Sequence, residues 1–157
     1  MAQVSSGSFL TNEVEGRSLK FNWAVDSTSI SENYKKIYWS VTGSGSASGY
    51  VMAGNFKVVI DGETVHNSAT RIELWNGTVV ASGYKILYHD TEGKKTFSAS
   101  VQAGIYEVAV NSTGSGTWEL PTISRYLKIT NFSISNITET SAIVNWITSD
   151  KRDSTYY

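Results

Sequence analysis

Apolar side chains alternate with polar ones along most of this chain, and this alternation limits the fold more than any other feature. Successive side chains of a β-strand point to opposite faces, so a strand with one buried face shows a period of two. The pattern is clear from Leu19 to Val25, from Ile37 to Val41 and from Phe56 to Ile60. No segment has the spacing of an amphipathic helix, and only Ser31 to Lys36 could hold a single helical turn. The chain is therefore expected to be all-β.

Turn residues separate further short strands at regular intervals. Asn76-Gly77 joins Arg71 to Trp75 with Thr78 to Val80, and Asn-Gly favours the type I′ turn of a hairpin. Other expected strands are Tyr84 to His89, Lys95 to Val101, Ile105 to Val110 and Trp118 to Leu120. The glycine-serine stretches Gly43 to Gly49 and Ser112 to Gly116 are expected to be loops. About eight to ten short strands predict a two-sheet antiparallel β-sandwich, either jelly-roll or immunoglobulin-like.

The single proline, Pro121, stands where this first pattern stops. We expect the sandwich to occupy residues 1–121 and a linker to occupy residues 122–125. A new alternation begins in residues 126–157, but about thirty residues cannot bury a core of their own. This last part is expected to be the first strands of an incomplete second domain.

Composition excludes several classes of partner. The net charge is −1, from 13 basic and 14 acidic residues, so the chain lacks the positive field that nucleic-acid binding needs. There is no cysteine, which excludes disulfides and thiolate metal sites. No apolar stretch is long enough to cross a membrane, so no membrane insertion is expected. Only 17% of residues are charged, and a surface of Ser, Thr, Asn and Gly is typical of an extracellular or virion β protein.

Two carboxylate pairs are the first candidates for chemistry. Asp61 and Glu63 flank a glycine, and Asp90 and Glu92 flank Thr91. Such pairs could bind calcium or act as acid and base in glycoside cleavage. Aspartate beside glycine is also ordinary turn chemistry, which is the simpler interpretation here.

The two histidines, His66 and His89, have no second histidine or cysteine at a metal-ligand spacing. No nucleophile-elbow motif G-x-S-x-G occurs either. We therefore expect no catalytic residues, no metal and no cofactor, and the protein is not expected to be an enzyme.

Aromatic residues are the more informative candidates. Three tryptophans fall in phase with aliphatic neighbours and are expected in the core: Trp23, Trp39 and Trp146. Tyr38 and Trp75 do not follow the alternation of the apolar residues beside them in their strands. Tyr50 follows the first glycine-serine stretch. An exposed ring can stack on a sugar, or it can pack against a neighbouring subunit or the second sheet. Tyr38, Tyr50 and Trp75 are therefore candidates for contact with a glycan or a protein.

Several segments, taken together, resemble a family of bacteriophage proteins. Tyr88 to Thr96 resembles the H-N-x-D-G-x-K hairpin of siphophage minor structural and tail proteins. Gly114 to Arg125 looks like their G-x-G-x-x-x-L-x-T-I-P-R domain ending, with Ser124 where the family often has proline. Ile129 to Trp146 resembles the opening strands of the fibronectin type III-like modules that come next in such proteins. Met1 to Val25 is similar to the start of streptococcal siphophage minor structural proteins of long-uncharacterised function.

The resemblance implies a non-enzymatic structural protein of the virion, associated with the phage tail or fibre and involved in attachment to the host surface. Such a protein is made in the bacterial cytoplasm and acts at the host cell surface. Its expected partners are other tail or virion proteins, host cell-surface polysaccharide, and further copies of itself in a trimer or higher ring. The alternative is a carbohydrate-binding module that recognises cell-wall polysaccharide through Trp75, Tyr38 or Tyr50. A cell-wall hydrolase is a third possibility, which would need two opposed carboxylates in a cleft.

Overall fold

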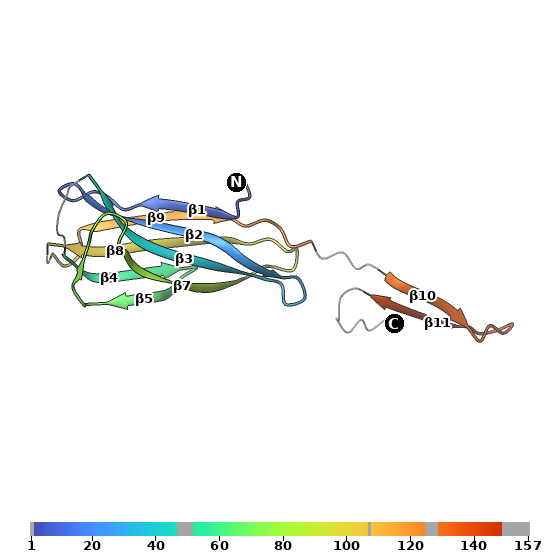
Figure 1. Ribbon diagram of the computed structural model, residues 1–157. Coiled ribbons are helices and arrows are strands. Elements are labelled where there is room, and N and C mark those ends of the chain that lie inside the picture. The colour runs from blue at the N-terminus through green and yellow to red at the C-terminus, as the bar shows by residue number, and fades with distance from the viewer. Residues whose placement is uncertain (1, 47–51, 107, 125–128, 149–157) are drawn as a thin grey trace.

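The computed structural model describes residues 2–46, 52–106, 108–124 and 129–148, which form strands joined by turns and loops (Figure 1). The strands are β1 (Ser6–Leu10), β2 (Arg17–Ser29), β3 (Tyr34–Gly45), β4 (Met52–Ile60), β5 (Glu63–Ser68), β6 (Ile72–Glu73), β7 (Val79–Tyr88), β8 (Thr96–Ile105), β9 (Ser112–Glu119), β10 (Ile129–Ser135) and β11 (Ile143–Thr148). The expected all-β fold is confirmed. The described residues contain no helix long and apolar enough to span a bilayer.

Two antiparallel sheets form the main body. One has the strand order β1-β2-β3-β7, and the other has the order β5-β4-β8-β9 with β6 paired to β4. Their inner faces contribute to a single hydrophobic core, which is the arrangement of a β-sandwich. Its largest fully buried side chains are Phe21, Phe56, Phe97, Leu19, Ile37, Ile60, Leu87, Ile105, Leu120, Val41 and Val58.

The longest pairing, between β2 and β3, explains how alternation builds this core. Phe21 lies opposite Val41 and Trp23 lies opposite Trp39, so residues of the same parity face inward together. Trp23 and Trp39 are buried, as their phase predicts.

One side of the sandwich is closed by contacts between β1 and β9. The backbone N–H of Val4 donates to the carbonyl of Glu119, and that of Asn12 donates to the carbonyl of Thr113, each at 2.9 Å. The loop expected from Ser112 to Gly116 is wrong, because these residues form most of β9. Their glycines permit close packing: a Cβ at Gly116 would lie 2.6 Å from the Trp118 ring. The other expected loop, Gly43 to Gly49, begins within β3, and its last three positions lie outside the described residues.

The strand expected from Ile105 to Val110 is also wrong, because β8 ends at Ile105. Tyr106 has a positive φ of 57°, which interrupts extended backbone. The side chain of Asn111 then bonds the backbone of Ile105, accepting from its N–H at 2.7 Å and donating to its carbonyl at 2.9 Å. An asparagine side chain thus replaces a strand partner at the end of β8.

A turn is present at Asn76-Gly77, but the expected hairpin is wrong. The N–H of Thr78 donates to the carbonyl of Trp75 at 2.9 Å, and only Gly77 has a positive φ, of 85°. A type I′ turn requires positive φ at both central residues, so this turn is not of that type. The flanking strands belong to different sheets, since β6 pairs with β4 and β7 pairs with β3. The turn therefore connects the two layers.

The C-terminal part of the described chain is an antiparallel hairpin of β10 and β11, in which Phe132 lies opposite Trp146. Trp146, expected in a core, is 40% exposed. A two-stranded hairpin has only one layer and cannot enclose an indole ring. Its assignment to a fibronectin type III-like module stays a prediction.

Candidate interaction surface

Five side chains on the outer face of β3 and β7 form an apolar surface that we call the tyrosine face. They are Tyr34, Tyr38, Tyr84, Ile86 and Tyr88. The register places Tyr34 opposite Tyr88 and Tyr38 opposite Tyr84, so all point away from the core. Tyr38, Tyr84 and Tyr88 are 41%, 57% and 63% exposed. Large apolar side chains gathered on one exposed face mark a site of interaction more often than isolated ones do.

The rings of the tyrosine face are ordered by contacts with one another. Tyr38 and Tyr84 meet edge to face, with centroids 5.4 Å apart, and Tyr34 and Tyr88 meet in the same way at 5.7 Å. The ammonium group of Lys36 lies 4.0 Å from the centroid of the Tyr84 ring, a cation–π contact. It also lies 3.3 Å from a carboxylate oxygen of Asp26 on β2. A partner would therefore meet rings that already have defined positions, which lowers the entropy cost of binding.

A polar row continues this face along the sheet. Asn22 lies opposite Ser40, and Ser40 lies opposite Ser82, so the three side chains share the outer surface of β2, β3 and β7. Amide and hydroxyl groups beside aromatic rings are the combination that binds sugar hydroxyls and sugar faces.

The structure does not bring the three predicted contact residues together. Tyr38 belongs to the tyrosine face, as its phase predicts. Trp75 is 49% exposed, but it lies on the turn between the layers. A Cβ placed at Gly43 would lie only 2.3 Å from the carbonyl oxygen of Trp75. Gly43 is an inward-facing position well beyond Tyr38 along β3, so Trp75 lies near the end of the sandwich. Tyr50 lies outside the described residues.

Tyr84 and Tyr88 were missed as site residues by the sequence reasoning. The signal was present, because Tyr84, Ile86 and Tyr88 alternate with Lys85 and Leu87 in the expected strand. Because both parities of the strand contain large apolar side chains, period two alone did not show which parity faced outward. The burial of Leu87 and the pairing with β3 decide it.

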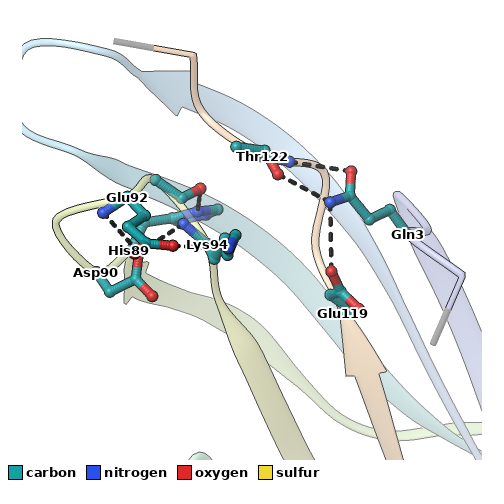
Figure 2. Close-up of polar contacts among 8 residues, drawn as sticks. Gln3, His89, Asp90, Glu92, Lys94, Glu119 and Thr122 are labelled. Atoms are coloured by element: carbon teal, nitrogen blue, oxygen red, sulfur yellow. Dashed lines mark hydrogen bonds and ion pairs between the residues drawn. The ribbon is translucent and has the colours of Figure 1, made fainter.

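A second feature is the point where the chain leaves the sandwich. The side-chain amide of Gln3 donates to the hydroxyl of Thr122 at 2.8 Å and to the carboxylate of Glu119 at 3.3 Å. Its side-chain carbonyl accepts from the N–H of Thr122 at 3.2 Å (Figure 2). The first residues of the described chain thus hold the residues that come after β9.

The turn between β7 and β8 holds the same exit from the other side. The carbonyl of Gly93 accepts from the N–H of Ile123 at 2.9 Å and from Nδ1 of His89 at 2.7 Å. Gly93 has a φ of 76°, and a Cβ there would lie 2.1 Å from the carbonyl oxygen of Ile123. Ile123 is buried, so the contacts of the sandwich continue two residues past the expected boundary at 121.

Asp90 organises this turn, which is the segment that resembles the siphophage hairpin. One carboxylate oxygen of Asp90 accepts from the N–H of Glu92 at 2.9 Å and from the N–H of Lys94 at 2.8 Å (Figure 2). This is the arrangement by which aspartate stabilises turns. The resembling residues therefore have structural roles here: Gly93 contacts the exit, His89 bonds the same Gly93 carbonyl, and Asp90 shapes the turn.

Burial lowers the pKa of His89 below its ordinary value of 6.5, and the charges of Lys35 and Lys95 act in the same direction. The hydrogen bond to Gly93 and the charge of Asp90 oppose this shift in pKa. The bond to a carbonyl requires the proton on Nδ1. In the neutral ring, which the lowered pKa favours, Nε2 is therefore the unprotonated nitrogen. Nε2 is buried and has no hydrogen-bond partner among the described residues.

The carboxylates considered for catalysis or calcium are engaged in turns and ion pairs. Asp61 pairs with Lys95 at 2.6 Å, Glu92 pairs with Lys94 at 2.6 Å, and Glu63 pairs with Lys85. Beside the β7–β8 turn, an open depression of about 640 Å³ is lined by Tyr88, His89, Asp90, Lys94, Lys95, Thr96 and Glu119. Within the described residues, no three His, Cys, Asp or Glu side chains lie close enough to hold a metal ion.

Comparison with known proteins adds no relative. No protein-family model, curated protein or solved structure matches the chain. The siphophage resemblance stays a prediction.

Proposed function

We propose that this protein is a non-enzymatic structural component of a bacteriophage virion, associated with the tail or fibre, that presents the C-terminal module toward the host surface. The observation that carries this proposal is the double attachment of the chain exit. Gln3 holds Thr122 from one side, and Gly93 holds Ile123 from the other.

A display protein must fix the direction in which the next module begins. The exit has two hydrogen bonds between Gln3 and Thr122 and one between Gly93 and Ile123, together with the buried side chain of Ile123. Each hydrogen bond contributes about 0.5–1.5 kcal/mol net. Together they order the backbone up to residue 123 and so fix the direction in which the chain leaves the sandwich.

The sequence resemblance supports the virion location and the order of modules. Host attachment then arises from many copies, because weak single contacts become strong when several engage together. Other tail proteins and host polysaccharide are the proposed partners, and the protein is made in the bacterial cytoplasm before assembly.

Labelling of intact particles tests this proposal. Antibodies raised against the 157-residue chain should decorate the tail of the phage that encodes it, and the chain should be found in purified particles by mass spectrometry. Its presence only in infected-cell lysate, with unlabelled particles, would refute a virion role.

A carbohydrate-binding module is the second candidate, because the polar row of Asn22, Ser40 and Ser82 lies beside the tyrosine face. Under this alternative, wall polysaccharide from host cells should bind the protein, and Tyr84→Ala should abolish the binding. Trp75→Ala is the control, since Trp75 lies on the turn between the layers. Binding that Trp75→Ala removes and Tyr84→Ala spares would place the sugar site at that turn instead.

A further inference from the structure

The chain exit is held by two attachments of different chemistry. On one side, Gln3 bonds Thr122 through amide, hydroxyl and backbone groups, none of which titrates near neutral pH (Figure 2). On the other side, the carbonyl of Gly93 accepts from the N–H of Ile123 and also from Nδ1 of His89. Histidine changes its charge between about pH 5 and 8. The second attachment therefore includes a group that titrates in this range.

Backbone contacts fix the position of His89, so its ring can leave Gly93 only by rotating about its own side-chain bonds. The N–H of His89 donates to the carbonyl of Asn33 at 2.9 Å. Its carbonyl accepts from the side-chain amide of Asn33 at 2.8 Å. The ring is buried, and Nε2 has no hydrogen-bond partner among the described residues. The carbonyl of Gly93 is thus the partner that holds the ring in its present orientation.

Burial and two ammonium groups act against a charged ring at this position. Lys35 belongs to β3, where it is buried and donates to the hydroxyl of Thr28 at 3.0 Å. Lys95 lies just before β8, and its ammonium group pairs with Asp61 at 2.6 Å. Asp90 acts in the opposite sense, but one of its carboxylate oxygens already accepts from two backbone N–H groups of the turn. The neutral ring is therefore the form that these surroundings favour.

The open depression beside the β7–β8 turn lies next to this ring. His89 lines it, and Lys94 and Glu119 are further charged residues along it. The ammonium group of Lys94 lies 2.6 Å from a carboxylate oxygen of Glu92. The carboxylate of Glu119 accepts from the side-chain amide of Gln3 at 3.3 Å. Rotation of the ring into the depression would therefore bring it into contact with solvent.

We propose that protonation of His89 releases the Gly93 side of the chain exit, so that mild acidity changes a double attachment into a single one. The second proton would lie on Nε2, which is buried and has no hydrogen-bond partner in the described part of the chain. Burying a charged N–H without a partner costs more than the single hydrogen bond to Gly93 contributes. The charged ring therefore rotates into the depression, where water solvates it, and Nδ1 leaves the Gly93 carbonyl.

The departure of the ring weakens the bond between Gly93 and Ile123. Two donors set the orientation of the Gly93 carbonyl, and one of them is the ring. Gly93 has a φ of 76°, and glycine has wide conformational freedom, so its peptide group can turn once the ring has gone. Asp90 still bonds two backbone N–H groups, so the turn itself persists. Ile123 is then released, while Gln3 continues to hold Thr122.

This inference adds regulation to the exit that carries the proposed display role, and it rests on that role. At neutral pH the direction in which the chain leaves the sandwich is fixed from two sides, and in mild acid it is fixed from one. The two proposals fail separately, because particle labelling reports the location of the protein and the exit residues report the switch.

NMR titration of the full chain tests the switch, with the ring protons of His89 and the backbone amide of Ile123 as its two reporters. Both should titrate with one midpoint, which lies below the ordinary histidine pKa of about 6.5. The amide order parameter of Ile123 should fall from about 0.85 to below about 0.6 across this midpoint. Leu120, whose N–H donates to the carbonyl of Lys95 at 2.9 Å, is the internal control and should stay rigid.

His89→Asn is the matched variant, because the asparagine amide can donate to Gly93 in place of Nδ1 but does not titrate. The order of Ile123 should then be independent of pH. Lys35→Met removes a charge that opposes protonation, so the midpoints of the ring and of the Ile123 amide should both move to higher pH. Lys20→Met makes the same change of charge at an exposed position of β2 and should leave both midpoints unchanged.

Three results would overturn the proposal. The first is titration of the His89 ring with no change in the order of Ile123. The second is a loss of order at Ile123 in His89→Asn at the same pH as in the wild type. The third is a ring that stays neutral down to about pH 5, the lower end of the range in which histidine switches act. If His89→Asn does not fold, unequal shifts of the two midpoints in Lys35→Met would separate the ring from the exit and reject the switch.

Discussion

The ring of His89 and the backbone N–H of Ile123 donate to the same acceptor, the carbonyl oxygen of Gly93, at 2.7 and 2.9 Å. One carbonyl group therefore joins the β7–β8 turn to the residues that leave the sandwich. The protonation and position of His89 are coupled through it to the chain exit.

Gly93→Ala should destabilise the sandwich more than an ordinary turn glycine does. Gly93 combines a positive φ with a Cβ position 2.1 Å from the Ile123 carbonyl oxygen. Gly62→Ala is the matched control, because Gly62 has a φ of 80° and open space around its Cβ position. We expect a loss of about 1 kcal/mol for Gly62→Ala from backbone strain. Gly93→Ala should cost about 2–3 kcal/mol or more, because packing is also disturbed. Urea unfolding measures both, and equal losses would show that Ile123 does not limit this site.

Gln3→Ala should loosen the chain exit with a small effect on global stability. It removes the bonds to both the N–H and the hydroxyl of Thr122, which lie at an exposed site and contribute about 1 kcal/mol. Amide relaxation measured by NMR at residues 122–124 should show increased motion. Gln102→Ala on β8 removes the same side chain away from the exit and should leave these residues unchanged. Unaltered relaxation in Gln3→Ala would remove the basis for a fixed exit.

Stability should fall as the pH decreases below about 6.5. Burial lowers the pKa of His89 in the folded protein, so the unfolded chain binds the proton at a higher pH than the folded chain does. The contribution of neutral His89 is complete above the unfolded pKa and is lost as the pH falls from there through the folded pKa. Urea midpoints at about pH 7.5 and 5.5 measure the loss. His89→Asn should reduce this difference, and an unchanged difference would assign it to other groups.

Phe97→Ala should be among the most damaging core substitutions. Phe97 is buried, with its ring centroid 4.9 Å from that of Trp23 and 5.4 Å from that of Trp118. Deleting a buried phenylalanine side chain costs about 3–5 kcal/mol. Tryptophan fluorescence during urea unfolding should show the loss. Phe132→Ala on the exposed hairpin is the control, and the stability of the sandwich should not change with it.

The alternation of side chains was sufficient to predict the fold class and much of the core. Residues such as Phe21, Ile37 and Val58 face inward because strand parity is a local property that the sequence displays directly. Tyr38 could be placed on an outer face for the same reason. Tyr84 and Tyr88 could not, because both parities of their strand contain large apolar side chains and only pairing with β3 fixes its orientation.

Errors arose where a local pattern had a long-range cause. Gly114 and Gly116 suggested a mobile loop, yet their missing side chains make room for Phe9 and Trp118 within a strand. Asn76-Gly77 does form a turn, but its two flanking strands pair with strands of different sheets and not with each other. Likewise the contacts of Gln3 with Thr122 join residues 119 positions apart, and no sequence window contains both.

The adjacency of Gln3 and Thr122 also has a mechanical consequence. Because the two ends of the sandwich lie at neighbouring points (Figure 1), the end-to-end distance of the folded domain is short. A force applied between the two ends of the sandwich would act first on the contact of Gln3 with Thr122. The two sheets would lie to one side of the line of force. The sandwich therefore does not act as a spacer that separates its own two ends.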